Sequence, residues 1–213
     1  MNKHGKLLFK YGTMSSGKSL HLIATAHNFQ EHNIPYIIIK SKIDTRDGEG
    51  VIHSRALGDI ECVTVSLEDN IYLIISNYLD SMYYAGYEIP KWILVDEAQF
   101  LTSNQVEQLS AIADNFGISV ICYGLRTDFK TNLFEGSKRL FELADSFEEI
   151  KSSCYCNHKT IFNARINKNK EIVTDGAQIE VGGDDRYTSI CRKCYFEAIS
   201  HPLYKNKKDN NLD

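Results

Sequence analysis

The sequence has no long hydrophobic run. Among its 213 residues, no apolar stretch approaches the roughly 18 residues that a transmembrane helix needs. The first residues, Met1 to Gly5, contain no sustained apolar segment of the kind found in a signal peptide. These absences predict a cytoplasmic protein that does not bind a membrane.

The sequence also lacks an excess of positive charge. Its net charge of −4 gives no overall attraction for nucleic acid, and its longest basic patch is only Lys205 to Lys208. We therefore expect no nucleic-acid partner. The patch lies in a polar segment, residues 201–213, which we predict to be a flexible tail. With 43% hydrophobic and 24% charged residues, the composition is that of an ordinary globular protein.

Disulfides are not expected in a reducing cytoplasm, although the chain has six cysteines. Cys62 and Cys122 stand alone in apolar, strand-like runs, and we interpret both as small core residues. The other four form the pairs Cys154-Tyr155-Cys156 and Cys191-Arg192-Lys193-Cys194. Four thiolates in two tight pairs favour tetrahedral Zn²⁺ in a closed, structural site.

The first cysteine pair leaves one choice open. C-x-C is a less common spacing than C-x-x-C, so His158 is an alternative ligand to Cys156. Buried free thiols or a redox pair are the other interpretations. A thioredoxin-like redox site would place its C-x-x-C at a helix start within a βαβ unit, which this pattern does not match.

Short apolar runs alternate with helical patterns over the first two-thirds of the chain. This alternation predicts a parallel sheet covered by helices on both faces, an α/β fold. Thr102 or Ser103 is the expected N-cap of the third helix. The expected strands are residues 6–12, 35–39, 60–65, 92–96 and 119–123, and the expected helices are residues 18–30, 71–78, 106–116 and 134–144.

The pattern changes after Phe147, where paired cysteines and short strand-like pieces replace long helices. We therefore predict a first domain over residues 1–147, a small metal-binding domain over 148–200 and the tail over 201–213. Ligands of open α/β sheets bind at the carboxyl ends of the strands. The motifs that follow lie at those ends.

A phosphate-binding loop follows the first strand. The sequence Gly12-Thr13-Met14-Ser15-Ser16-Gly17-Lys18-Ser19 matches G-x-x-x-x-G-K-S between a strand and a helix, the context that the motif requires. Its glycines let backbone N–H groups converge on phosphate oxygens beside the positive end of the helix. Lys18 would reach the β- and γ-phosphates of ATP, and the Ser19 hydroxyl would coordinate Mg²⁺. An accidental glycine turn is the simpler alternative, but the flanking elements favour a nucleotide site.

An acidic pair, Asp96-Glu97, follows the apolar strand at residues 92–95. Asp96 would hold Mg²⁺ opposite Ser19, which leaves Glu97 available as a general base. A solvated charged pair that opens a loop is the alternative.

If Glu97 activates water, the protein is an ATPase; if it deprotonates an alcohol, the protein is a small-molecule kinase. Apolar side chains near the acid favour the kinase, although each alone could be ordinary core: Phe100, Leu125, Phe129 and Phe134.

Together these motifs resemble the tetrameric, cellular-type thymidine kinases. The resemblance extends from Leu7 to about Ala198 and is most specific in two blocks, Asp96-Glu97-Ala98-Gln99-Phe100 and the glycine-pair–tyrosine–cysteine block from Gly182 to Cys194. Asp44-Thr45-Arg46 and Gly124 to Phe129 also match. The C-x-C pair departs from the commoner C-x-x-C, although a C-x-C form occurs in the family.

The resemblance implies a P-loop (RecA-like) domain with a small zinc-binding lasso domain, and it assigns roles to residues. Glu97 is the implied proton acceptor for the 5′-hydroxyl of thymidine. The implied ATP-binding residues are Gly12, Thr13, Met14, Ser15, Ser16, Gly17, Lys18, Ser19, Asp96 and Gln99, with Arg46 and Asp44 in a loop that reaches the phosphates and the metal. Met14, Phe100, Leu125, Phe129 and Phe134 are the implied thymine pocket, and Tyr187 belongs to the lasso, whose backbone binds the base. For Arg46 and Arg55, a solvated loop charge is the alternative.

The family resemblance also implies a homotetramer, ATP and Mg²⁺ as reactants, deoxyuridine as a further substrate and dTTP as a feedback inhibitor. Two other functions remain as alternatives to a thymidine kinase. One is a P-loop ATPase with a zinc-dependent partner surface, and the other is a kinase for a different deoxynucleoside. Nucleotide hydrolysis without thymidine would indicate the ATPase, and a panel of nucleosides would identify the other kinase.

Overall fold

The fold is seen in a computed structural model, which describes residues 4–44, 48, 50–54, 57–178 and 186–201. Arg46, Arg55, the Gly182-Gly183 pair and the tail from residue 202 lie outside the described residues. A six-stranded parallel sheet forms the main body, in the order β5-β2-β6-β7-β1-β8. Its strands are β1 (Leu7–Gly12), β2 (Tyr36–Ser41), β5 (Val63–Val65), β6 (Trp92–Asp96), β7 (Ser119–Leu125) and β8 (Ser146–Ile150).

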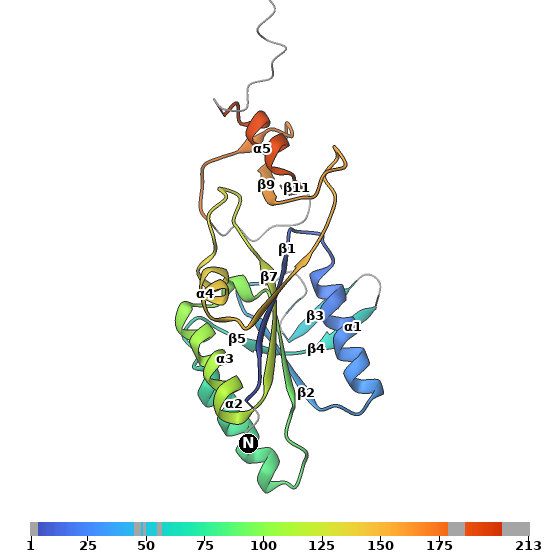
Figure 1. Cartoon of the computed structure of the whole chain (residues 1–213), viewed down its shortest axis with the longest axis vertical. Coiled ribbons are helices and arrows are strands. Elements are labelled where there is room, and N and C mark those ends of the chain that lie inside the picture. The colour runs from blue at the N-terminus through green and yellow to red at the C-terminus, as the bar shows by residue number, and fades with distance from the viewer. Residues whose placement is uncertain (1–3, 45–47, 49, 55–56, 179–185, 202–213) are drawn as a thin grey trace, which may run out of the picture.

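Helices cover both faces of this sheet, as predicted (Figure 1). One face carries α1 (Lys18–Glu31), and the other carries α2 (Ile71–Tyr84), α3 (Ser103–Phe116) and α4 (Glu135–Leu143). The central strands read as continuous apolar runs because alternate side chains point to opposite faces. Ile93 and Val95 of β6 pack on the α2–α3 side, whereas Leu94 between them packs on the α1 side.

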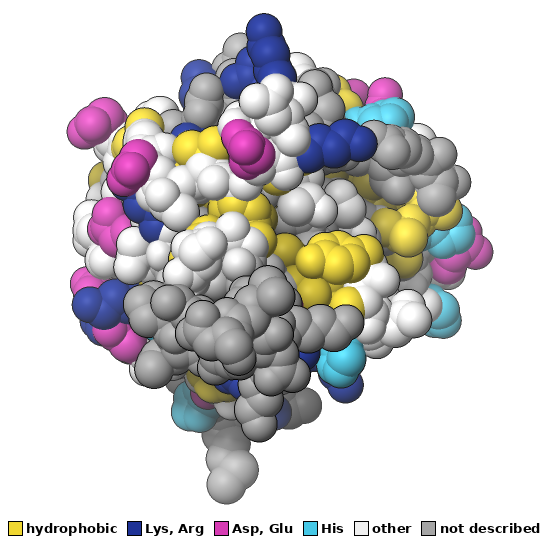
Figure 2. Space-filling model, turned by 90° about the horizontal axis from the view of Figure 1, so that it is seen from above, with side chains coloured by type: hydrophobic (Ala, Val, Ile, Leu, Met, Phe, Trp, Pro, Cys, Tyr) yellow, Lys and Arg dark blue, Asp and Glu magenta, His cyan; other side chains and the backbone are white. Residues whose placement is uncertain are grey.

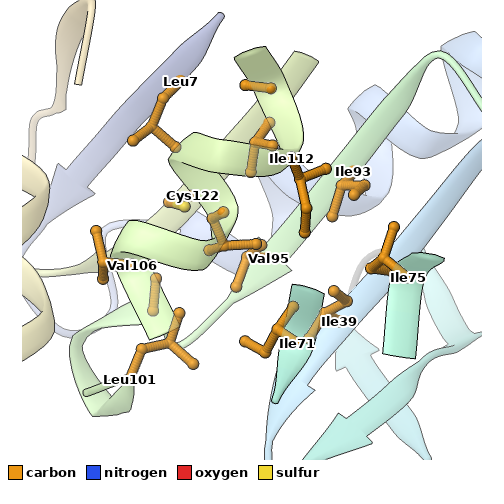
Figure 3. Packing of buried hydrophobic residues seen from close by; sticks show 14 of the residues in the cluster. Leu7, Ile39, Ile71, Ile75, Ile93, Val95, Leu101, Val106, Ile112 and Cys122 are labelled. Atoms are coloured by element: carbon orange, nitrogen blue, oxygen red, sulfur yellow. The ribbon is translucent and has the colours of Figure 1, made fainter. Parts of the chain in front are cut away.

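The larger of the two cores lies between the sheet and helices α2 and α3 (Figure 3). Ile71 and Ile75 from α2 and Ile112 from α3 point toward Ile39 and Val95 of the sheet, and all are 2% exposed or less. Helix α3 begins with a capping box: Thr102 Oγ1 accepts from the Gln105 N–H, and Gln105 Oε1 accepts from the Thr102 N–H, both at 3.1 Å. The sequence-based N-cap at Thr102 is therefore confirmed.

The single strand expected at residues 60–65 is wrong in its extent, because the extended segment is interrupted at Cys62 and forms parts of two strands. Gly58–Glu61 forms β4, which pairs with β3 (Val51–Ser54) in an antiparallel hairpin, and only Val63–Val65 joins the sheet as β5. The two halves of the run serve different cores: Ile60 packs on the α1 side and Val65 on the α2–α3 side. Cys122 is buried in β7 as expected, whereas Cys62 is only half-buried.

Strand β8, which spans the expected boundary at residue 147, was not predicted. It pairs with β1 along its whole length, with Phe147 opposite Phe9 and Ile150 opposite Gly12. As an edge strand it buries only Ile150, so its sequence contains no apolar run to mark it. The parallel sheet therefore extends to Ile150.

A second, smaller unit lies beyond the carboxyl ends of the strands (Figure 1). It consists of a three-stranded antiparallel sheet in the order β10-β9-β11 and a short helix. Its small core includes three of the paired cysteines together with Phe162 and Tyr195. The elements are β9 (Phe162–Ile166), β10 (Ile172–Val173), β11 (Tyr187–Ile190) and α5 (Arg192–Ala198). Among the described helices, none combines the length and the apolar character needed to cross a membrane.

Helix α2 provides a matched test of this packing. Ile75 is 2% exposed in the core, whereas Leu73 on the same helix is 55% exposed. We expect Ile75→Ala to lower the free energy of unfolding by about 2–5 kcal/mol, because it removes buried methyl groups and leaves a cavity. Leu73→Ala should change it by less than about 0.5 kcal/mol. Urea unfolding of both variants checks this, and equal losses would contradict the assigned helix face.

Candidate functional site

The candidate site lies where three adjacent parallel strands end. In the order β6-β7-β1, the carboxyl ends of these strands deliver Asp96, Leu125 and Gly12 to one edge. Gly12 and Leu125 are register partners. The sheet topology therefore brings together three motifs that lie far apart in the sequence, as open α/β sheets do at their ligand sites.

The phosphate loop connects β1 to α1. Gly17, directly before the helix, has φ 89°, and Ser15 also adopts a positive φ, of 55°. These left-handed residues curl the backbone toward the helix N-terminus, which favours anion binding there. Lys18 is buried, and its Nζ donates to the Thr13 carbonyl at 2.9 Å. The ammonium group thus lies against the loop.

Ser19 and Asp96 form the pair that could hold a divalent cation. Ser19 Oγ donates to Asp96 Oδ2 at 3.2 Å. Asp96 Oδ1 is buried and has no hydrogen-bond partner among the described residues, and neither has the Ser16 hydroxyl in the loop. Burial, and next the Glu97 carboxylate, raise the pKa of Asp96 to about 7. A carboxylate with a free oxygen beside a serine hydroxyl suits Mg²⁺, which would stabilise its charged form.

Glu97, directly after Asp96, has an unusual backbone conformation and a hydrogen-bond partner of its own. It has φ 49° and ψ 40°, a left-handed conformation that is uncommon for a residue with a side chain. It directly precedes the 3₁₀ turn η1 (Ala98–Phe100). Its carboxylate accepts a hydrogen bond from Gln99 Nε2, and Gln99 Oε1 accepts from the Leu125 N–H at 2.9 Å. Gln99 therefore anchors the carboxylate of Glu97 to the end of β7.

The approach of Gln99 to β7 requires a glycine. A Cβ atom at position 124 would lie 2.8 Å from Gln99 Oε1 and 3.1 Å from the Gln99 backbone nitrogen. Gly124 thus leaves the space that lets the side chain of Gln99 reach the β7 backbone.

A buried ion pair lies at the end of the neighbouring strand β2. Lys40 Nζ is 3.1 Å from Asp44 Oδ2, and the two side chains are 0% and 3% exposed. Lys40 Nζ also donates to the Val51 carbonyl in β3, and Lys40 is the register partner of Asp96. Asp44 is therefore fixed beside the β6 end, whereas the expected role of Arg46 falls outside the described residues.

The expected base-pocket residues come from four places: the phosphate loop, the end of β7, the connection after β7, and η1. The rings of Phe100 and Phe134 meet edge to face, with centroids 5.9 Å apart. Leu125 ends β7 and is nearly buried, and Met14 is half-buried in the phosphate loop. Figure 2, which looks onto this end of the molecule, shows hydrophobic side chains in the middle of the face. Around them, the described basic and acidic side chains are interspersed.

Arg165 of β9 connects two further predicted residues. Its guanidinium lies over the Phe129 ring at 3.8 Å from the centroid. Its Nε and Nη2 donate to the Tyr187 hydroxyl at 3.1 and 3.0 Å, and Nη2 also donates to the Ala177 carbonyl. The arginine is 6% exposed, so Phe129 and Tyr187 are held together by a buried cation.

The sequence analysis missed Arg165, and also Asn163 two residues earlier on β9. Both are buried polar residues in the run Phe162–Ile166. A charged residue in an otherwise apolar strand indicates a buried partner, so Arg165 was visible as a candidate. Its partners, which come from a distant loop and from β11, were not.

The four paired cysteines meet in the small unit, and their sulfur atoms all lie within 4.8 Å of one another. Cys154, Cys191 and Cys194 are buried and Cys156 is half-buried. His158 lies beside the cluster, with Nδ1 3.4 Å from Cys156 Sγ. The geometry therefore favours four sulfur ligands, with His158 as their neighbour, and four converging thiols can hold a thiophilic metal.

These features define a nucleoside triphosphate-binding protein of the P-loop class with a cysteine-built metal site. Comparison with known proteins agrees. A model of the family described as "Thymidine kinase" matches residues 5–195. Thymidine kinase from Pasteurella multocida is 44% identical over 195 residues, covering 92% of this chain and 98% of that protein. The chain belongs to the thymidine kinase family.

A further relative agrees with this assignment, whereas the solved structure compared with the chain is only weakly similar. Thymidine kinase from Haemophilus influenzae strain 86-028NP is 42% identical and covers 90% of this chain and 96% of its own length. A solved structure, Pif1 helicase from Candida albicans, covers 70% of this chain and 36% of its own with a TM-score of 0.44 and 14% identity. A likeness at that level adds nothing to the family assignment.

The cysteine cluster predicts tight metal binding. We expect the protein purified under reducing conditions to contain about one zinc ion, held by the four thiolates, and Cys191→Ser to lose it because three sulfur ligands no longer close the site. Elemental analysis checks this. Cys62→Ser is the matched control and should retain the metal. A metal-free wild-type protein that does not take up added Zn²⁺ would contradict the prediction.

Proposed function

We propose that this chain is an ATP-dependent thymidine kinase, which transfers the γ-phosphoryl group of ATP to the 5′-hydroxyl of thymidine or deoxyuridine. The products would be the nucleoside monophosphate and ADP. The observation that carries the proposal is the placement of Glu97. Its buried carboxylate is anchored by Gln99, whereas the neighbouring carboxylate of Asp96 accepts from Ser19, the last residue of the phosphate loop.

In this proposal the residues from Gly12 to Ser19 bind the triphosphate of ATP through backbone N–H groups and the Lys18 ammonium. The hydroxyl of Ser16, buried without a partner among the described residues, supports this because a phosphate oxygen would satisfy it. Ser19 and Asp96 would hold Mg²⁺, which supplies charge neutralisation at the β- and γ-phosphates. Gln99 acts through Glu97 in this arrangement, and the loop that contains Asp44 and Arg46 would reach the phosphates and the metal.

Glu97 acts as the general base. As the 5′-oxygen bonds to the γ-phosphorus, its proton passes to the Glu97 carboxylate, and the bond from the γ-phosphorus to the bridging oxygen breaks to release ADP. A carboxylate bound to a metal would be a poor proton acceptor, and in this proposal the metal is held by Ser19 and Asp96 while Glu97 bonds to Gln99. Holding the hydroxyl and the carboxylate in fixed positions lowers the entropic cost of the transfer.

The thymine base would lie among apolar walls, which favour a flat ring over bulk water. We assign these walls to Met14, Phe100, Leu125, Phe129 and Phe134. Tyr187 and its neighbours would cover the base as the lasso. The edge-to-face Phe100–Phe134 pair and the Arg165 link between Phe129 and Tyr187 support this assignment, because both fix aromatic side chains before any ligand arrives.

Several further proposals rest on the family resemblance. The four cysteines Cys154, Cys156, Cys191 and Cys194 hold a structural Zn²⁺ that stabilises a unit too small to fold on its own core. The chain forms a homotetramer in the cytoplasm, and dTTP inhibits it by occupying the site. Its product feeds DNA synthesis through nucleotide salvage.

Glu97→Gln tests the proposed base. The amide keeps the shape of the side chain but cannot accept a proton, so we expect kcat to fall by about 10²–10⁴-fold. ATP binding, measured by calorimetry, should persist because the phosphate loop is unchanged. Glu107→Gln, on the exposed surface of α3 where Glu107 pairs with Arg139, is the control and should keep wild-type turnover. Retained kcat in Glu97→Gln would remove Glu97 from the mechanism.

A nucleoside panel tests the reaction itself. With MgATP, we expect phosphorylation of thymidine and of deoxyuridine, which lacks only the methyl group, worth about 1–3 kcal/mol in an apolar pocket. ADP release should depend on the nucleoside. If ADP forms equally fast without any nucleoside, the ATPase alternative is supported. If another deoxynucleoside is preferred, the substrate assignment is wrong while the kinase assignment stands.

A further inference from the structure

The peptide groups of Met14 are held from outside the phosphate loop. The Met14 N–H donates to Asn163 Oδ1 at 2.7 Å, and the Met14 carbonyl accepts from Ser189 Oγ at 2.6 Å. Asn163 lies on β9 and Ser189 on β11, directly opposite each other in the antiparallel register. Side chains of such a cross-strand pair emerge on the same face of the sheet. The pair therefore bonds to both the N–H and the carbonyl of one loop residue, and we call these two hydrogen bonds the grip on Met14.

Asn163 is itself fixed on its other side. Its Nδ2 donates to the Thr127 carbonyl at 3.2 Å, and the residue is 3% exposed. The amide thus bridges the phosphate loop and the segment after β7. Because Oδ1 must accept from one backbone and Nδ2 must donate to another, only one orientation of the amide satisfies both bonds.

A second contact holds the preceding residue of the loop. Thr13 Oγ1 lies 2.9 Å from both Ser152 Oγ and Thr160 Oγ1, and those two hydroxyls are 2.6 Å apart. Thr160 precedes β9, so this buried cluster of hydroxyls also ties the loop to the small unit. The Thr13 side chain and the Met14 backbone are therefore bonded to residues outside the loop, whereas the Thr13 carbonyl accepts from Ser16 and Lys18 within it.

We propose that Asn163 and Ser189 are positioning residues for both substrates of the reaction. Through the backbone of Met14 they fix the first half of the phosphate loop for ATP, and they place the Met14 side chain at the wall of the nucleoside pocket. This inference rests on the proposed function for the identity of the substrates. The geometry of the grip does not depend on it.

The grip matters because the loop must be rigid before ATP binds. N–H groups that converge on phosphate are not available to pair within the loop, so the position of the loop depends in part on bonds such as those of Met14 to Asn163 and Ser189. The loss of either bond to Met14 should weaken binding of both substrates by roughly tenfold, the effect of one hydrogen bond in a positioned network. A role in stability alone would instead lower the amount of folded enzyme and leave the KM values unchanged.

The test compares Asn163→Ala, Ser189→Ala and the double variant with wild-type enzyme in steady-state kinetics. We expect KM for ATP and KM for thymidine each to rise roughly tenfold in the single variants. The double variant should lose less than the product of the two single effects, because both side chains act on the same residue. Ser189→Thr keeps the hydroxyl and should stay near wild type.

Matched controls and a second measurement make the outcomes distinct. Asn115→Ala and Ser81→Ala remove the same side chains from exposed positions on α3 and α2 and should leave both KM values unchanged. If Asn163→Ala does not fold, the Ser189 series carries the test. Unchanged KM values in Ser189→Ala, or a loss in Ser189→Thr as large as in Ser189→Ala, would overturn the inference.

Failure of the proposed function would look different. If wild-type enzyme forms no thymidylate, the affinity for MgADP, measured by calorimetry, replaces the kinetic readout. A roughly tenfold weaker affinity in Ser189→Ala would then support the grip even though the substrate assignment had failed, whereas equal affinities would overturn the grip.

Discussion

The structure depends on one constraint: a backbone N–H that a loop presents to a phosphate is not available to stabilise the loop itself, so part of the loop must be held from outside. The first half of the loop, Thr13 and Met14, is bonded instead to side chains of the small unit. The second half is continuous with α1, whose helical bonds begin at Gly17. The main sheet supplies the ends of the strands, but the shape of the loop also depends on the small unit that contains the four clustered cysteines.

The composition of the small unit follows from its size. Its core has few members, several of which are cysteines, so apolar burial alone supplies little stability at this size. A metal held by four thiolates would provide the missing free energy. If a metal stabilises the unit, its strands need fewer apolar side chains. Asn163, Ser189 and Arg165 are then available for polar contacts with residues of the main domain. Arg165 is buried, and such a charge is tolerable because the Phe129 ring and the Tyr187 hydroxyl compensate for the lost water.

The parts of this arrangement that the sequence predicted are those encoded within a few neighbouring residues. The phosphate loop, the apolar strand before Asp96 and the cap at Thr102 each depend on local spacing, and each is found as expected. Strand β8 was missed because it is an edge strand that buries only Ile150, and the β3–β4 hairpin because its polar sequence resembles a loop. Asn163 was missed for a different reason. Its importance comes from the register that sets it opposite Ser189, and register between distant strands is not visible in one sequence.

The backbone at Glu97 adopts an unfavourable conformation that sets the position of its side chain. A left-handed residue with a side chain costs about 1–2 kcal/mol relative to the right-handed form, and an asparagine or glycine would adopt it more easily. The turn is nevertheless imposed, because Gln99 is bonded to both the Glu97 carboxylate and the β7 backbone and thereby fixes the start of η1. In a right-handed conformation the chain would continue from Asp96 along a different path, and Glu97 would lose its bond to Gln99. The strain therefore keeps two adjacent carboxylates in different environments, one facing Ser19 and the other facing Gln99, which is the condition for one to hold a cation while the other accepts a proton.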